Sequence, residues 1–303
     1  MPTARAHHLL LLAASMTALA CAATPAPVAD APQEAPPPAE AQATSPAPAA
    51  SSTPRVVVDD GGRELFRARD VEGAFVLLDA TTGERVEVAP ERAGIGEPPA
   101  STFKIPNTLI GLTTGVIPDA DFALKWDGTP RQIAAWNRDH DLRSAMKHSV
   151  VWFYQEVARR IGEARMAAWV ARLEYGNADI SGGVDRFWLD GALRISAREQ
   201  VEFLRRLHAR ELPVTREHAA LVEELIELER GPGWVLRGKT GLTEQGDRTV
   251  GWLVGILEEG ERSYLYATLV LAGAEDLERV IPLRAALTRA LLQRHGHPLA
   301  STG

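Results

Sequence analysis

A serine and a lysine three residues apart, Ser101 and Lys104, follow a pair of prolines and constrain this chain more than any other feature. If a helix begins near Ser101, Lys104 lies one turn further along the same face, so the two side chains can meet. A serine hydroxyl is a weak nucleophile that needs a base, and lysine is a base only after it loses its charge. Because Phe103 and Ile105 are apolar, we expect a desolvated first turn. The stretch predicts an acyl-transfer nucleophile, Ser101, beside its activator, Lys104.

The S-x-x-K pattern is weak evidence by itself, because at ordinary residue frequencies it occurs by chance about once in a chain of this length. A second match, from Ser144 to Lys147, is present in the same sequence. The structural alternative for Ser101 is a helix N-cap. The interpretation therefore depends on the motifs that accompany the first match. Ser144 is not accompanied by such motifs and is assigned no chemistry.

Length and composition narrow the classes of function. The chain has 303 residues and a formal net charge of −7, which argues against nucleic acid as the main partner. A single cysteine, Cys21, allows no internal disulfide and no cysteine zinc site. His295 and His297 lie in the C-terminal tail, where we expect no neighbouring carboxylates and no metal.

The N-terminal region is typical of export. Residues 1–20 read as a secretory signal, with Arg5 ahead of an apolar run too short to span a bilayer comfortably. Cys21 at the end of this run resembles the lipidated first mature residue of a bacterial lipoprotein; the alternative is simple secretion, with cleavage at Ala20 or a few residues later. Residues 21–54, rich in Ala and Pro, predict a disordered tether. We expect a periplasmic or secreted protein, tethered to the envelope membrane if Cys21 carries a lipid.

The folded domain is expected over residues 55–303. Apolar patterns predict strands at 73–79, 85–88, 234–238, 249–257 and 263–271, and helices at 101–115, 149–160, 163–173, 196–210, 216–228 and 283–295. Pro106 should kink the first of these helices or end its first segment. Strands at both ends with helices between them predict an α+β, two-lobed fold: one antiparallel sheet built from both ends and flanked by helices, plus a mainly helical lobe. We expect the site in a cleft between them.

Four further signals follow Ser101 in order. They are S-V-V at 149–151, Y-G-N at 175–177 in a glycine-rich loop, F-W-L at 187–189, and K-T-G at 239–241, which should end a strand just before a turn. Each has an ordinary structural explanation when taken singly: Ser149 as an N-cap, Asn177 as a turn residue, Trp188 as core and Lys239 as a surface charge. Their occurrence together, in this order, favours one catalytic site.

In this order of motifs the sequence resembles the class D (oxacillinase-type) serine β-lactamases, relatives of the penicillin-binding proteins. The resemblance spans about residues 73–287, and it includes the runs P-A-S-T-F-K-I-P-N at 99–107, S-G-G at 181–183 and R-I-S at 194–196. It implies the β-lactamase/transpeptidase-like fold and the hydrolysis of β-lactam antibiotics, an activity that confers antibiotic resistance, with no metal cofactor.

The resemblance also implies roles for the residues around the nucleophile. Ser101 would attack the lactam carbonyl and become acylated. Lys104 would react with carbon dioxide to form N6-carboxylysine, whose carboxylate acts as general base. Trp188 would hydrogen-bond this carbamate, while Phe103 and Val151 would shield it from water.

Further roles concern the substrate. The family's oxyanion hole corresponds to the backbone N–H groups of Ser101 and Leu242. Ser149 would relay a proton to the lactam nitrogen. The substrate carboxylate would meet the K-T-G segment (Lys239, Thr240, Gly241) and Arg284, whose structural alternative is a solvated arginine at a helix start.

Two alternatives share the motifs: a β-lactam sensor domain that stays acylated, and a penicillin-binding D-Ala-D-Ala peptidase. Sensors usually follow several membrane helices, whereas the signal is the one apolar run in this sequence. The class D motif set with Trp188 weighs against the peptidase. The motifs specify neither an oligomeric state nor which β-lactams are preferred.

Overall fold

The computed structural model describes residues 55–299. The predicted signal peptide, Cys21 and the tether lie outside these residues. Between residues 55 and 299 no helix is long and apolar enough to cross a membrane, and no three histidine, cysteine or acidic side chains gather there as a metal site. The expectation that the two tail histidines have no neighbouring carboxylates is wrong: His295 lies 3.1 Å from Asp59, and His297 lies 2.8 Å from Glu259, partners far away in sequence.

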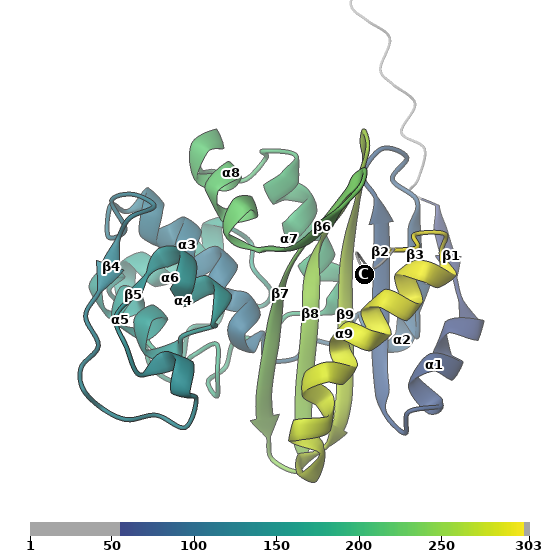
Figure 1. Cartoon of the computed structure of the whole chain (residues 1–303), viewed down its shortest axis with the longest axis horizontal. Coiled ribbons are helices and arrows are strands. Elements are labelled where there is room, and N and C mark those ends of the chain that lie inside the picture. The colour runs from purple at the N-terminus through teal and green to yellow at the C-terminus, as the bar shows by residue number, and fades with distance from the viewer. Residues whose placement is uncertain (1–54, 300–303) are drawn as a thin grey trace, which may run out of the picture. The chain divides into compact units, whose positions relative to one another are not determined.

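A seven-stranded sheet with strand order β1-β3-β2-β9-β8-β7-β6 forms the centre of the domain (Figure 1). Its strands are β1 (Val56–Val58), β2 (Glu72–Asp79), β3 (Arg85–Val88), β6 (Glu227–Gly231), β7 (Trp234–Gln245), β8 (Arg248–Glu259) and β9 (Arg262–Gly273). A separate two-stranded ribbon pairs β4 (Ala123–Leu124) with β5 (His140–Asp141). The predicted sheet built from both ends of the domain is confirmed. Its pairs are antiparallel except β1 with β3, which is parallel and makes the sheet mixed.

Side chains of the central strands alternate between two cores, as the period of two along a strand requires. In β2, Ala74 and Val76 belong to one core, whereas Phe75 and Leu77 belong to the other. The second core is covered by α1 (Arg63–Arg67) and α9 (Leu277–Arg294), and Figure 1 shows α9 lying across the sheet. On the opposite face, α7 (Ala197–His208) packs against β2 and β9.

The helical lobe surrounds α3 (Lys104–Thr113), which is buried from its first residue and packs against α5, α6 and α8. The other helices between residues 55 and 299 are α2 (Pro90–Ala93), α4 (Leu142–Lys147), α5 (Val151–Ile161), α6 (Glu163–Arg172) and α8 (Arg216–Leu225). Short 3-10 helices span Asp60–Gly62, Ala100–Phe103, Ala134–Trp136 and Ala274–Asp276. Because α3 is central and begins at Lys104, this lysine is carried into the interior of the protein.

Pro106 does not behave as predicted. It is the third residue of α3 and does not end this helix, which runs on to Thr113. The first four N–H groups of a helix have no partner inside the helix, so a proline at the third position costs no hydrogen bond.

Two boundaries near the expected site are also wrong. The K-T-G segment does not end a strand, because β7 continues to Gln245 and pairs with β8 along its whole length. The last helix begins at Leu277 rather than at residue 283, with Pro282 inside it, so Arg284 lies within α9. The short edge strands β1 and β6 were not predicted.

Candidate active site

The predicted meeting of Ser101 and Lys104 is present. Ser101 lies in the 3-10 turn Ala100–Phe103, which leads directly into α3. Lys104 Nζ lies 2.8 Å from Ser101 Oγ, within hydrogen-bonding distance. Ala100, just before the nucleophile, is buried and has a φ of +47°, a conformation that is strained for a residue with a Cβ. Ser101, the predicted nucleophile, therefore sits on a tight, strained turn ahead of a buried helix.

Lys104 is 1% exposed. Burial, and secondly the charge of Lys239, hold the pKa of Lys104 well below its usual range. Its amine lies 5.4 Å from the centre of the Tyr154 ring. A lysine in such a site favours the neutral amine, which can accept a proton or react as a nucleophile.

Ser149 and Lys239 form a second hydroxyl–amine pair. Lys239 Nζ donates to Ser149 Oγ at 3.0 Å and to the Thr240 carbonyl oxygen at 3.0 Å. Burial, and secondly the charge of Arg284, lower the pKa of Lys239 to about 7. Ser149 has a φ of +54° and precedes α5 without capping it. This amine can therefore gain or lose a proton near neutral pH, next to a hydroxyl that can relay it.

Arg284 reaches the same strand from α9. Its Nη1 donates to the Gly241 carbonyl oxygen at 2.6 Å, whereas its buried Nε has no hydrogen-bond partner among the described residues. Burial lowers its pKa to about 10, so it stays charged at neutral pH. The solvated helix-start alternative for Arg284 is thus wrong, since Arg284 lies inside α9, its side chain is half-buried and its Nη1 donates to β7.

Gly241 is required by close packing rather than by a turn. A Cβ at this position would lie 2.7 Å from the Pro99 carbonyl oxygen and 3.2 Å from the Thr102 side chain. The turn Ala100–Phe103 that carries Ser101, called the nucleophile turn after the predicted role of this serine, therefore rests directly against the middle of β7. This contact explains why a glycine occurs inside a strand at this point.

The outer edge of β7 is open beyond Gly238. The Gly238 N–H donates to Ile226, on the β6 side, and β6 pairs no further along β7 than Arg237. Backbone groups alternate in direction along a regular strand. The N–H groups of Thr240 and Leu242 consequently point to the same, unpaired edge, and Leu242 follows the glycine that touches the nucleophile turn.

Aromatic rings enclose the Ser101 turn on its inner side. Phe103 and Trp188, both buried, stack with their ring centres 5.3 Å apart. Phe187 meets Phe103 edge-on at 4.9 Å. Val151 begins α5 two residues after Ser149 and is half-buried; its predicted contact with Lys104 stays a prediction.

The second S-x-x-K match is structural. Ser144 and Asp141 form a capping box at the start of α4, and Lys147 is exposed. A second capping box joins Ser196 and Glu199 at the start of α7, where the sequence predicts a helix from residue 196. Neither pair contributes a group to the Ser101 site.

Two buried residues beside the nucleophile were missed. Tyr175, predicted only as part of a glycine-rich loop, is buried, and its hydroxyl lies 3.3 Å from that of Thr102. Gln200 of α7 donates to the same threonine hydroxyl at 2.8 Å. The signal for Gln200 was a polar residue on the apolar face of a helix that begins at a strong capping box.

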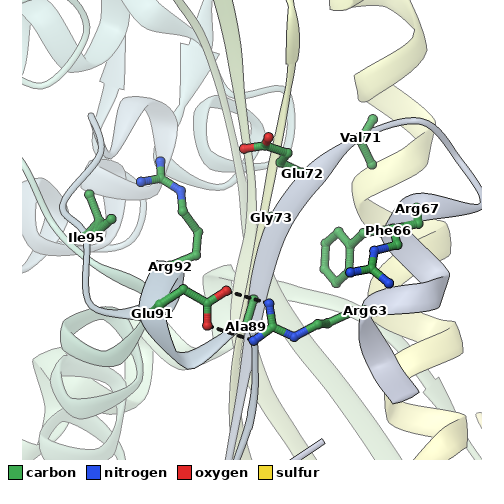
Figure 2. Close-up of a pocket in the computed structure, with 10 residues that line it drawn as sticks. All are labelled: Arg63, Phe66, Arg67, Val71, Glu72, Gly73, Ala89, Glu91, Arg92 and Ile95. Atoms are coloured by element: carbon green, nitrogen blue, oxygen red, sulfur yellow. Dashed lines mark hydrogen bonds and ion pairs between the residues drawn. The ribbon is translucent and has the colours of Figure 1, made fainter. Parts of the chain in front are cut away.

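The cavity drawn in Figure 2 is separate from this site. It has a volume of about 450 Å³ and is lined by Arg63, Phe66, Arg67, Val71, Glu72, Gly73, Ala89, Glu91, Arg92 and Ile95. Figure 2 shows Arg63 paired with Glu91 at one end of it, with Nη2 to Oε2 at 2.7 Å. Since its lining contains no serine, cysteine, histidine or lysine, it has no nucleophile and is not a candidate for acyl transfer.

A helix-covered sheet, a serine–lysine pair at the start of a buried helix and a K-T-G segment on the adjoining strand define the β-lactamase/transpeptidase-like class. The family model described as "Penicillin binding protein transpeptidase domain" matches residues 73–293.

Individual relatives narrow the class. The chain is 42% identical over 229 residues to β-lactamase OXA-48 of Klebsiella pneumoniae, covering 76% of this chain and 85% of that protein. It is 39% identical over 234 residues to β-lactamase OXA-10 of Pseudomonas aeruginosa, covering 76% and 87%. The solved class D β-lactamase of Sebaldella termitidis has a TM-score of 0.77 at 31% identity, over 80% of this chain and 99% of that one. The chain belongs to the class D β-lactamase family of hydrolases that act on cyclic amides, as its motifs predicted.

Proposed function

We propose that this protein hydrolyses β-lactam antibiotics through an acyl-enzyme on Ser101, with Lys104 carrying the general base as a carbamate. The observation that supports this most directly is the 2.8 Å contact between Ser101 Oγ and the buried Lys104 amine. A protonated lysine could not accept the serine proton, and burial removes that obstacle.

Acylation uses groups on both sides of the substrate. Ser101 Oγ gives its proton to the Lys104 side chain and attacks the lactam carbonyl carbon. The N–H groups of Ser101 and Leu242 stabilise the negative charge that develops on the carbonyl oxygen. As the lactam C–N bond breaks, Ser149 passes a proton to the nitrogen. Lys239, 3.0 Å from Ser149 and with a pKa of about 7, can replace that proton. Water then hydrolyses the ester and frees Ser101.

The residues around Lys104 fit a carbamate. Only a neutral amine reacts with carbon dioxide, and burial favours that form. Trp188, stacked on Phe103 next to Lys104, offers a single N–H donor for an anion in an otherwise apolar pocket. When it is bound, carbon dioxide supplies a carboxylate that provides general-base chemistry.

The substrate's own carboxylate is assigned to the cationic side of the site. Lys239 Nζ donates to the Thr240 carbonyl oxygen. Arg284 Nη1 donates to the carbonyl oxygen of Gly241, the next residue along β7, and Arg284 Nε has no partner among the described residues. Cations and hydroxyl groups of this kind are suited to a carboxylate. The assigned substrates are therefore β-lactams that bear an acidic group next to the lactam nitrogen.

For the N-terminal region we propose export and a lipid on Cys21, with residues 21–54 as a tether. This proposal is supported by the apolar run ending at the only cysteine. It places the enzyme at the bacterial envelope, periplasmic or secreted.

The mature protein and its Ser101→Ala variant test the function. We expect the wild type to hydrolyse a chromogenic cephalosporin repeatedly, and intact mass spectrometry to show a penicillin adduct on wild type but none on Ser101→Ala. An adduct on the variant would exclude Ser101 as nucleophile. A wild-type adduct that persists without turnover would identify a sensor, and cleavage of D-Ala-D-Ala peptides instead would identify a peptidase.

A further inference from the structure

The turn that carries Ser101 is held at one atom, the Pro99 carbonyl oxygen. This oxygen accepts the Thr102 N–H at 3.1 Å and the Thr102 hydroxyl at 2.8 Å. The same oxygen packs against Gly241 on β7. Between Pro99 and Thr102 lie the strained Ala100 and the nucleophile. Because strained backbone persists only where its surroundings over-determine it, the two bonds from Thr102 are a restraint on the position of Ser101.

The direction of the Thr102 hydroxyl is in turn fixed by Gln200. A hydroxyl has one proton, and Thr102 gives it to Pro99. Its oxygen can then only accept, and Gln200 Nε2 donates to it at 2.8 Å. The other end of the same amide, Oε1, faces the Tyr175 hydroxyl at a longer 3.4 Å. The amide orientation therefore follows from the network, since the reverse orientation would set two acceptors against each other.

Gln200 is itself held in a defined position, so it can fix the orientation of the Thr102 hydroxyl. It is 1% exposed, and Thr102 and Tyr175 are fully buried, so no water competes for these bonds. It lies in the first turn of α7, whose start is set by the Ser196–Glu199 capping box. The helix packs against β2 and β9 in the central sheet. A buried polar group whose partners are all satisfied selects one geometry, because any other leaves a donor or acceptor unpaired.

We propose that Gln200 is a positioning residue for the nucleophile: through Thr102 and the Pro99 carbonyl it holds Ser101 in register with Lys104 and with the N–H of Leu242. It touches neither substrate nor reacting atoms. The inference rests on the proposed acylation of Ser101. It adds to the site a residue, Gln200, that lies 98 positions after its hydrogen-bond partner Thr102 in the sequence.

The first test is Gln200→Met, which keeps the length of the side chain and removes both hydrogen bonds. We expect the rate constant for acylation by a fluorescent penicillin to fall on the order of 10- to 100-fold, the loss typical of a small misplacement of a reacting group. The dissociation constant of the non-covalent complex, measured in a Ser101→Ala background, should change less than threefold. The matched control is Gln155→Met, which removes an amide hydrogen bond to the Asp185 carbonyl and should leave acylation near the wild-type rate.

The second test is Gln200→Glu, which tests whether residue 200 must donate the hydrogen bond to the Thr102 hydroxyl. Burial raises the pKa of the new carboxyl, and while it is protonated it can still donate to Thr102. Once ionised it can only accept, and the Thr102 hydroxyl turns from Pro99 toward it. The acylation rate of this variant relative to wild type should therefore fall as pH rises from 5 to 8.5, whereas a role in stability alone gives a flat ratio at temperatures well below both melting points.

The outcomes separate the two proposals. If wild type is not labelled at all, the proposed function fails. If wild type is labelled and Gln200→Met acylates within twofold of it, or the Gln200→Glu ratio is flat, the positioning role is overturned. If Gln200→Met does not fold, Gln200→Glu still tests the proposal, because its protonated form keeps the hydrogen bonds to Thr102 and Tyr175. Failure of that variant to fold at pH 5 would overturn the assigned hydrogen-bond directions.

Discussion

Gly241→Ala tests whether the close approach of the nucleophile turn to β7 matters for catalysis. The added Cβ would lie 2.7 Å from the Pro99 carbonyl oxygen, 3.2 Å from Thr102 and 3.3 Å from Trp252. The oxygen and the strand must separate by roughly 0.7 Å to restore ordinary contact. Two of the three neighbours offer backbone or Cβ atoms, which cannot rotate away as the end of a long side chain can. The separation must come from the turn, from β7, or from both.

This displacement affects the two N–H groups assigned to the oxyanion hole, because one belongs to Ser101 and the other to Leu242, on opposite sides of the contact. Catalytic groups must be held within about 0.5 Å of their productive geometry. We expect kcat/KM for a chromogenic cephalosporin to fall on the order of 10- to 100-fold. Overpacking should also cost about 1–3 kcal/mol of stability, which lowers the melting temperature by roughly 2–4 °C for each kcal/mol in a domain of this size.

Gly260→Ala is the matched control. Gly260 has a φ of +59°, and no atom lies within 4 Å of the place a Cβ would take, so alanine there strains the backbone but meets nothing. We expect a stability loss on the order of 1 kcal/mol with kcat/KM unchanged. If Gly241→Ala keeps kcat/KM within twofold of wild type, or loses no more activity than Gly260→Ala, the contact between turn and strand does not set the catalytic geometry.

Three further predictions follow from the buried lysines and the N-terminus. Because the Lys104 nitrogen must be neutral to hold carbon dioxide, enzyme kept acidic and degassed should be slow until bicarbonate is added. Trp188→Phe should need more bicarbonate to recover its activity. A missing carbamate signal in carbon-13 NMR would contradict the assignment. The folded pKa of Lys239, about 7, lies below its ordinary 10.5, so the unfolded chain binds the extra proton between these values and stability should rise with pH across that window; Lys239→Met should reduce this rise, compared by urea unfolding at pH 6.5 and 9.5, and an unchanged rise would refute the burial of Lys239. Cys21→Ala should move the protein from the membrane fraction to the soluble one or leave the signal uncut, whereas wild type that is already soluble would rule out the lipid.

Local chemistry accounts for what the sequence could predict. The contact of Ser101 with Lys104 follows from helical spacing, and the capping box of Ser196 with Glu199 follows from residue types three apart. The long strands β8 and β9 could be predicted because their apolar runs are continuous. In each case the deciding interaction joins residues that are close in the chain.

The features that were mispredicted depend on residues far apart in the chain. Gly241 resembled the end of a strand because glycine is rare inside strands, but the Pro99 carbonyl, 142 positions earlier, requires it. Gln200 resembled an ordinary polar residue until α7 was placed beside the nucleophile turn. Pro106 resembled a helix breaker because the start of α3 was placed at Ser101, three residues too early. Periodicity carries no information on such contacts, which the tertiary fold creates.

The site's stability cost and its function have the same origin. The pKa values of Lys104, Lys239 and Arg284 are all lowered, and the causes are burial and neighbouring cations, with no carboxylate among them. Such a cluster destabilises the folded state, because the unfolded chain would hold its protons more readily. A nearby acidic residue would relieve this cost, but it would also occupy the cations and raise the pKa of Lys104, which would block the reaction with carbon dioxide. In the proposed mechanism, leaving the cations unpaired keeps one amine neutral and reserves the other charges for the carboxylate of the substrate. Replacing Lys239 with methionine should accordingly make the protein more stable near neutral pH while it removes the proton donor to Ser149.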